Sequence, residues 1–154
     1  MGRIMGLDFG SKTVGVAMTD ALCLIASPCE TIVRDKENKL RPTLRRIAEL
    51  CKDQEIDRVV VGLPLNMDGT AGERVQKTEE FCALLRSRLL AMDLDIPIVL
   101  WDERLSTQAA DEILEQSGVK NAERKTYIDK IAAALILEDY MRNGIGSEES
   151  GKRK

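Results

Sequence analysis

Histidine is absent from all 154 residues of this chain. Its absence excludes Ser-His-Asp hydrolases, Cys-His proteases, His-ligated zinc sites and phosphohistidine chemistry. Aromatic residues make up only 3% of the sequence, which argues against a stacking platform as the main way of binding nucleic acid. The net charge of −3 indicates neither strong basicity nor the extreme acidity typical of disorder. Any chemistry therefore has to use carboxylates, amines, hydroxyls, thiols or a bound metal.

Paired cysteine motifs and long apolar runs are also missing. The four cysteines, Cys23, Cys29, Cys51 and Cys82, include no C-x-x-C pair, so a zinc ribbon or a thioredoxin-like motif is not expected. The longest apolar run, residues 131–137, is far too short to span a membrane. An acid also stands where a signal peptide would be apolar. We expect a cytoplasmic protein with reduced thiols and no membrane partner.

The length and the hydrophobic pattern predict a single α/β domain. Strands are expected at residues 3–8, 13–19, 26–33, 57–62 and 96–101. Helices are expected from about Pro42, around Val75 to Leu89, from Ser106 or Thr107 to Gln116, and from Tyr127 to Arg142, with a polar connection at 122–126. This order predicts a mixed five-stranded sheet, in the order 3-2-1-4-5, with helices on both faces, which is the ribonuclease H-like fold. Residues 1–144 would form the domain and residues 145–154 a flexible polar tail.

Acidic residues are predicted to meet at one edge of this sheet. Asp8 ends the first strand, Asp102 and Glu103 end the fifth, and Asp129 opens the last helix. Each acid alone could be solvated, or could favour a helix dipole. The topology, however, brings the C-terminal ends of strands one, four and five together, so three of these acids should converge.

Small residues follow Asp129 by one helical turn. Ala132 and Ala133 would let the last helix approach the sheet closely and bring Asp129 near Asp8. Helix propensity alone would explain the alanines, but not the acid on their face. Clustered carboxylates without histidine suit Mg²⁺ or Mn²⁺, and two such ions can hydrolyse a phosphodiester. The predicted chemistry is therefore metal-assisted phosphodiester hydrolysis with two ions.

Four blocks of the sequence resemble the YqgF/RuvX family, described as Holliday junction resolvase-like proteins and pre-16S rRNA nucleases. They are LDFGSKTVGVAMTD (7–20), VVVGLPLNMDGT (59–70), LWDERLST (100–107) and IDKIAAALILEDY (128–140). The resemblance covers residues 3–142 and implies an RNase H-like fold, a divalent-metal nuclease site and a bacterial cytoplasmic setting. Carried over by motif, the family's catalytic and metal-binding acids fall on Asp8, Glu103 and Asp129. Asp102 is the alternative to Glu103, but it would point to the opposite face if the strand continues.

Three polar residues near the same edge are expected to contact substrate. Lys12 lies in a glycine-containing hairpin turn, Asn66 in the loop after the fourth strand, and Arg104 beside the predicted acids. Each also has a structural interpretation, because turns use such residues and Arg104 could pair with Asp102. Residues 34–46 carry six basic and two acidic residues, and they form either a phosphate-tracking surface or a solvated helix start.

The leading hypothesis is a nuclease that matures the 5′ end of pre-16S rRNA during ribosome biogenesis. One alternative is a Holliday junction resolvase acting on DNA, and another is a catalytically silent nucleic-acid-binding module. The partner would be precursor rRNA, within the small-subunit precursor, or structured DNA, and the protein would be a monomer or a homodimer. The segment DFGSKTVG also resembles the phosphate-binding hairpin of actin-like ATPases and sugar kinases, but 154 residues cannot form both lobes of such enzymes.

Overall fold

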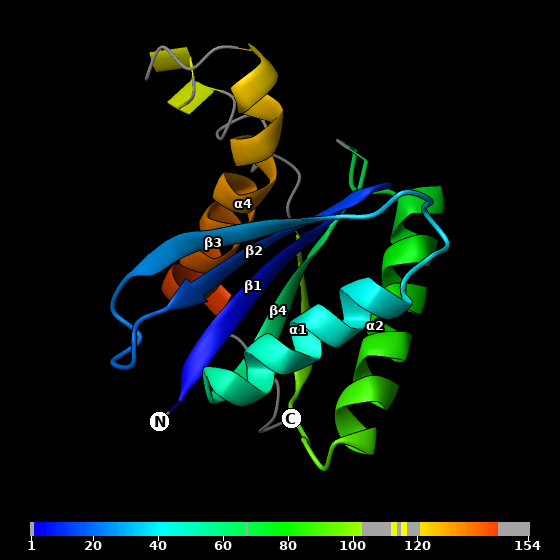
Figure 1. Ribbon diagram of the computed structural model, residues 1–154. Helices are drawn as coiled ribbons and strands as arrows, with labels where there is room; N and C mark the ends of the chain where they lie inside the picture. The colour runs from blue at the N-terminus through cyan, green and yellow to red at the C-terminus, as the bar shows by residue number, and fades with distance from the viewer. Residues whose placement is uncertain (1, 67, 103–111, 114, 117–120, 145–154) are drawn as a thin grey trace.

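A five-stranded mixed sheet runs through the molecule, with helices on both of its faces (Figure 1). The structure is a computed structural model, and it describes residues 2–66, 68–102, 112–113, 115–116 and 121–144. The strands are β1 (Arg3–Phe9), β2 (Thr13–Thr19), β3 (Ala26–Val33), β4 (Ile56–Leu63) and β5 (Ile98–Asp102). Their spatial order is β3-β2-β1-β4-β5, with antiparallel pairing from β1 to β3 and parallel pairing of β1, β4 and β5. The strand order predicted from the sequence is confirmed.

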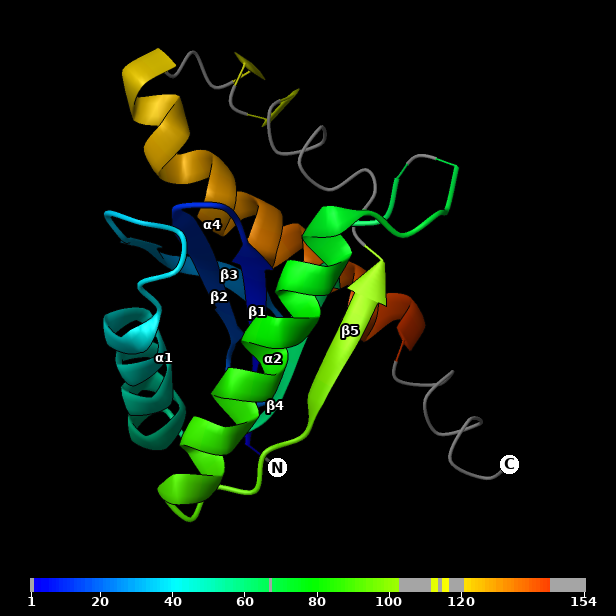
Figure 2. The same ribbon diagram turned by 90° about the vertical axis from the view of Figure 1, so that its right-hand side faces the viewer.

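Two helices cover one face of the sheet, and one long helix crosses the other. The helices are α1 (Arg41–Asp53), α2 (Glu73–Ala91) and α4 (Asn121–Asp139), the last continuing into a π-helical turn, η1 (Tyr140–Gly144). Figure 2 shows α1 and α2 on one side of the strands and α4 on the other. In the part of the chain that the structure describes, no helix has the length and apolar character needed to cross a bilayer. The helix expected at 106–116 falls mostly outside the described residues, and the tail at 145–154 falls wholly outside them.

The central strands are buried on both faces, which is why their sequences are nearly continuous apolar runs. Side chains alternate along β1. Met5, Leu7 and Phe9 belong to the core beneath α1 and α2, whereas Ile4 belongs to the smaller core beneath α4. The next residue on the α4 side after Ile4 and Gly6 is Asp8, so the alternation places this acid on the face that α4 covers.

The last helix begins at Asn121, six residues before the predicted start. The expectation of a polar connection at 122–126 is therefore wrong. These residues are polar, but alanine, glutamate, arginine and lysine are all good helix formers, and polarity alone does not end a helix. As a result, Asp129 lies about two turns inside α4 rather than in its first turn. A favourable interaction with the start of the helix dipole no longer explains this acid, because that effect fades beyond the first turn.

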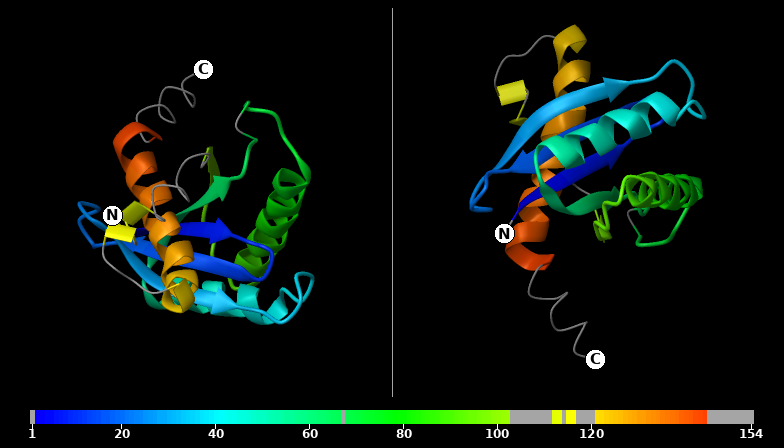
Figure 3. Two further views of the ribbon diagram at one scale, coloured as in Figure 1. Left: turned by 90° about the horizontal axis from the view of Figure 1, so that it is seen from above. Right: turned by 60° about the horizontal axis from the view of Figure 1, so that its bottom comes forward.

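Two glycines let α4 lie directly on the sheet, where it crosses the strands (Figure 3). A Cβ atom on Gly6 would lie 2.9 Å from the carbonyl oxygen of Ala133. A Cβ atom on Gly15 would lie 1.9 Å from the carbonyl oxygen of Asp129. Real Cβ atoms do not approach backbone so closely, so both positions require glycine for space. The close approach expected from the alanines after Asp129 is present, and the sheet contributes to it as much as the helix does.

We expect Gly15→Ala to lower the free energy of unfolding by about 3 kcal/mol or more, the upper range for overpacking, because the new methyl group meets backbone rather than a movable side chain. Urea denaturation measures the loss. Gly72→Ala is the matched control. A Cβ there meets only the Asn66 side chain, at an ordinary 3.6 Å, so its effect should stay within about 0.5 kcal/mol. Equal effects of the two substitutions would contradict the close approach.

Candidate active site

Asp8 and Asp129 are brought to the same place by the pairing of β1 with β2. Asp8 pairs with Gly15 across the strands, and the carbonyl group of Asp129 lies directly on Gly15. The Asp129 carboxylate accepts a 2.7 Å hydrogen bond from Oγ1 of Thr13, whose side chain lies on the same face as Gly15. Both acids are half-buried. Two carboxylates from segments 121 residues apart therefore share one end of β1, on the side that α4 covers.

The third predicted acid, Glu103, lies outside the described residues, as does Arg104. Its neighbour Asp102 ends β5 opposite Leu63 and is exposed. The preceding residue, Trp101, faces α4, because its indole Nε1 donates a 2.6 Å hydrogen bond to Asp139. Alternation along the strand then directs Asp102 to the opposite face. The geometry places Asp102 on the opposite face of the sheet from Asp8 and Asp129.

The donor set at this edge suits a hard cation. Mg²⁺ takes one or a few carboxylates and keeps several waters, and Asp8 and Asp129 supply two such carboxylates. Among the residues that the structure describes, no three His, Cys, Asp or Glu side chains gather closely enough to hold a metal ion. Completing the set therefore depends on a residue outside them. Asp8 and Asp129 fit the predicted metal chemistry as two of its three proposed carboxylates.

Two of the four thiols, those of Cys51 and Cys82, do not belong to this chemistry. Cys51 lies in the core beneath α1 and α2, and Cys82 is packed against that core. Burial raises the pKa of each thiol to about 12, so both stay protonated at neutral pH and are poor nucleophiles and poor metal ligands.

The turn between β1 and β2 carries Lys12 and is held by Arg34. One guanidinium nitrogen of Arg34, Nη2, donates to the carbonyl oxygens of Gly10, at 2.6 Å, and Ser11, at 2.9 Å. The backbone N–H of Arg34 donates to the carbonyl oxygen of Lys12 at 2.8 Å. Lys12 itself is exposed. The predicted contact residue therefore sits on a turn of fixed shape, beside the strand end that carries Asp8.

Sequence reasoning missed the role of Arg34 because it counted this residue among the basic residues of the 34–46 run. Arg34 is only 6% exposed, and its burial lowers the pKa of the guanidinium group, an effect that Glu37 opposes. The available signal was the hairpin register. Thr13 pairs with Val33, so the next residue has to lie beside the turn.

The other basic residues of the 34–46 run have different surroundings. Arg46 forms two hydrogen bonds with the Glu30 carboxylate, at 3.1 and 2.8 Å. Arg46 is exposed, as are Lys36, Lys39, Arg41 and Arg45. The basic residues of the run thus do not share one role. One arginine builds the hairpin turn, another is an ion-pair partner, and four residues remain available at the surface.

Asn66 shapes its own loop. Its side-chain amide donates a 2.9 Å hydrogen bond to Oγ1 of Thr70, and its backbone N–H donates to the Thr70 carbonyl oxygen at 2.9 Å. Asp68 accepts from the backbone N–H of Thr70 at 2.9 Å. Asn66 therefore stabilises its own loop, as the structural interpretation of this residue predicts. The loop follows β4, at the upper end of the strands in Figure 2.

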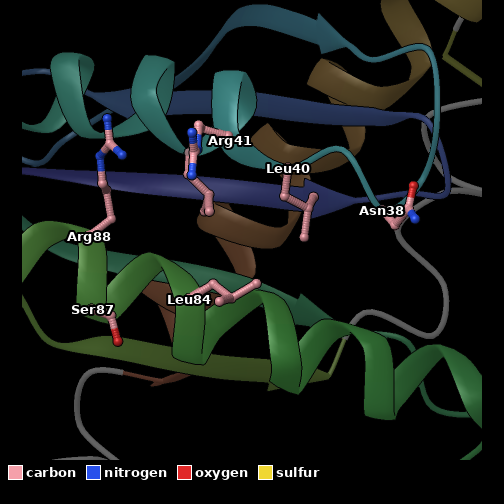
Figure 4. Close-up of a pocket in the computed structure, with 7 residues that line it drawn as sticks. Asn38, Leu40, Arg41, Leu84, Ser87 and Arg88 are labelled. Carbon is pink, nitrogen blue, oxygen red and sulfur yellow. The ribbon is translucent and has the colours of Figure 1, made fainter.

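A groove between α1 and α2 is distinct from the acidic pair. It has a volume of about 450 Å³. Leu40 and Arg41 approach it from α1 and the segment before it, and Leu84 and Arg88 from α2 (Figure 4). Because α1 and α2 cover the face opposite α4, the groove cannot share a substrate atom with Asp8 and Asp129 on the other face.

Comparison with known proteins gives a family match over most of the chain. Residues 2–143 match the RuvX family, described as Holliday junction resolvase. A protein of Lachnospira eligens named "Putative pre-16S rRNA nuclease" is 49% identical over 141 residues, which span 92% of this chain and 97% of the relative. A protein of Listeria monocytogenes with the same name is 46% identical over 139 residues, spanning 90% of this chain and 96% of the relative.

Solved structures share the fold at low sequence identity. RuvC of T. thermophilus, described as in complex with Holliday junction substrate, matches with a TM-score of 0.56 and 16% identity, over 94% of this chain and 97% of RuvC. A second Thermus thermophilus RuvC structure matches with a TM-score of 0.56 and 17% identity, over 92% and 96% of the two chains. The RNase H-like fold predicted from the strand order is confirmed.

We expect Thr13→Val to lower the free energy of unfolding by about 1 kcal/mol, because a partly buried hydrogen bond to a carboxylate is lost while the shape is kept. Thr13→Ser retains the hydroxyl group and should cost less. In an Asp129→Ala background, the same Thr13→Val change should cost almost nothing, since its partner is gone. Chemical denaturation of the four variants measures this coupling. Additive effects would show that the hydrogen bond contributes nothing in solution.

Proposed function

The chain belongs to the RuvX family, and from this membership we propose that it is a divalent-metal-dependent nuclease, a hydrolase of phosphodiester bonds. One observation carries the proposal: Asp8 and Asp129 meet across Gly15 at the end of β1. Carboxylate oxygens from two separate segments, brought to one strand end, are ligands that a hard divalent cation prefers. A silent binding module would need no metal, so the carboxylate pair favours the nuclease over that alternative.

The proposed metal ligands and catalytic residues are Asp8, Glu103 and Asp129, with Mg²⁺ or Mn²⁺ as two bound ions. When bound, the ions would activate a water molecule and stabilise the leaving oxygen. The chain's own part is to hold the ligands: β1 fixes Asp8, and the hydroxyl group of Thr13 orients the Asp129 carboxylate. Hydrogen bonds of this kind commonly tune metal affinity. We prefer Glu103 to Asp102 because alternation along β5 turns Asp102 away.

Substrate contacts are proposed for Lys12, Asn66 and Arg104. Lys12 is exposed on a turn next to Asp8, where an ammonium group can meet a phosphate oxygen. Asn66 belongs to the loop at the same strand ends, where ligands of open α/β sheets bind. Its amide has one N–H engaged by Thr70, and an amide has a second N–H and a carbonyl oxygen to offer. Arg104 would supply a guanidinium group beside the acids.

The proposed substrate is precursor 16S rRNA at its 5′ end, in a cytoplasmic small-subunit precursor. The Lachnospira eligens relative, 49% identical, is named "Putative pre-16S rRNA nuclease", which supports precursor 16S rRNA as the substrate. The family description supports the second candidate, a resolvase of four-way DNA junctions.

Purified protein should be offered 5′-extended small-subunit rRNA and a synthetic four-way junction. Cleavage of the RNA but not of the junction supports the rRNA nuclease. A monomer is sufficient for that activity. Paired cuts in the junction by a homodimer would instead support the resolvase of four-way DNA junctions.

Cleavage should require a divalent cation and should accept Mn²⁺ in place of Mg²⁺, because both ions suit oxygen ligands. Exhaustive chelation should abolish the activity, and either ion should restore it. Gel analysis of the cleaved substrate provides the measurement. Full activity in the chelated protein would end the metal proposal.

Asp8→Asn keeps the shape of the side chain but removes its charge, so cleavage should fall by at least about a hundredfold, the scale of losing one main electrostatic contributor. Equivalent changes at Glu103 and Asp129 should not add to this loss, because residues that act as one unit are not additive. Asp102→Asn is the matched control and should have far less effect. The choice of Glu103 is wrong if Asp102→Asn matches Asp8→Asn while Glu103→Gln remains active. Normal cleavage by Asp8→Asn would remove the nuclease proposal's central residue.

A further inference from the structure

Two arginines gather over one aromatic ring on the other side of the same strand end. The guanidinium carbon of Arg34 lies 4.7 Å from the centre of the Phe9 ring, and that of Arg74 lies 5.6 Å from it. Phe9 directly follows Asp8 in β1, but it faces α1 and α2. The two guanidinium groups thus contact the same ring, and the positive charge of Arg74 acts on Arg34, on the face of the sheet opposite the acidic pair.

Both arginines keep a buried nitrogen without a hydrogen-bond acceptor. Arg34 uses Nη2 and Nε on backbone carbonyl groups, and Arg74 uses Nη1 on the Glu37 carboxylate. Within the described part of the chain, Nη1 of Arg34 and Nη2 of Arg74 have no partner. A buried N–H without an acceptor costs free energy. Both donors belong to guanidinium groups that pack on the Phe9 ring, and a group rich in acceptor oxygens would satisfy them.

The cluster of Arg34, Arg74 and Lys77 around Glu37 carries a net positive charge, which favours a negatively charged ligand. The Glu37 carboxylate accepts from Arg74 and from Nζ of Lys77, at 3.1 Å, whereas, within the described residues, Arg34 bonds to Glu37 only at its backbone carbonyl oxygen. The hydrogen bonds from Arg74 and Lys77 hold the pKa of Glu37 below its ordinary value, so Glu37 remains a carboxylate. Three cations and one carboxylate leave a positive excess. A second acid, Glu73, is 81% exposed and lies 3.8 Å from Nζ of Lys77.

The start of α2 adds donors at the same place. Arg74 is the second residue of this helix, and the N-cap residue Gly72 makes no side-chain capping bond. The N–H groups of a first helical turn favour an anion. The Arg74 side chain is 36% exposed, so a ligand can approach from its side. Glu37 accepts from the side chains of Arg74 and Lys77, and a bound anion would take over one of these two donors.

We propose that Arg34 and Arg74, with the start of α2, form a phosphate-binding site on the face of the sheet opposite Asp8. In the nucleic acid it would take a backbone phosphate away from the scissile bond, so that the strand is held on both sides of the β1 end. This assignment rests on the proposed function for its ligand. Free phosphate has the same chemistry, and the experiment distinguishes the two sources.

The test measures binding and no cleavage, in the full chain with divalent metal removed. Fluorescence anisotropy follows a labelled single-stranded oligonucleotide binding to wild type, Arg74→Gln and Arg86→Gln. Arg86 is the matched control, because it lies on the same helix and is already engaged by Asp95 at 3.0 Å. Arg74→Gln should weaken binding about tenfold, the scale of one charge-assisted hydrogen bond, and reduce the salt dependence by about one charge. Arg86→Gln should bind like wild type.

Two further variants distinguish loss of a binding site from general destabilisation of the fold. Glu37→Gln removes the competing carboxylate charge and should tighten oligonucleotide binding, which a damaged fold would not do. Arg34→Lys keeps the charge but loses the forked geometry and should weaken binding. Equal binding by Arg74→Gln and Arg86→Gln, or no tightening by Glu37→Gln, would overturn the proposal.

Inorganic phosphate identifies the source of the ligand. At matched ionic strength, phosphate should raise the Tm of wild type more than chloride does, and Arg74→Gln should lose that increase. If Arg74→Gln abolishes the increase in Tm but leaves oligonucleotide binding unchanged, the site binds free phosphate. The assignment to a backbone phosphate of nucleic acid is then wrong. Because no step depends on cleavage, an active Asp8→Asn variant would overturn the proposed function without touching this result.

Discussion

The contact of α4 with the backbone of β2 at Gly15 is the constraint on which the candidate site depends. Gly15 pairs with Asp8, and Asp129 lies directly on it. A second close contact, of Ala133 with Gly6, fixes the helix one turn further along. Two contacts four residues apart set both the height and the rotation of a rigid helix. Any side chain at Gly15 would lift Asp129 away from Asp8, so the site is built by the absence of a side chain.

The strand order and the two-sided burial of the central strands could be predicted from the sequence, because both follow from periodicity and from connection rules. The close contact at Gly15 could not. In TVGVAMT this glycine is an ordinary strand residue, and only packing against a helix more than a hundred residues away gives it a role. The start of α4 was missed for the opposite reason, since local helix propensity was stronger than the polar composition indicated.

Asp8 was predictable because an acid at the end of an apolar strand is conspicuous, whereas Arg34 was hidden inside a run of charges. Its role depends on the turn between β1 and β2, whose carbonyl groups need donors and have Arg34 as their neighbour. A buried backbone carbonyl left without a donor is costly, which explains why an arginine, with several donors, occupies this position. Charge counts along a sequence cannot distinguish such a residue from a solvated one.

Alternation along β1 gives the two faces of the sheet different properties at one strand end. Asp8 turns toward α4 and Phe9 toward α2, so a carboxylate pair and an arginine pair lie one residue apart, on opposite sides of the sheet. The sheet between them keeps the arginines from neutralising the acids directly. An acidic site can then attract cations while a basic one, at the same edge, attracts phosphate. A chain with a net negative charge can in this way present a local positive surface to a polyanion, without the bulk basicity that its composition lacks.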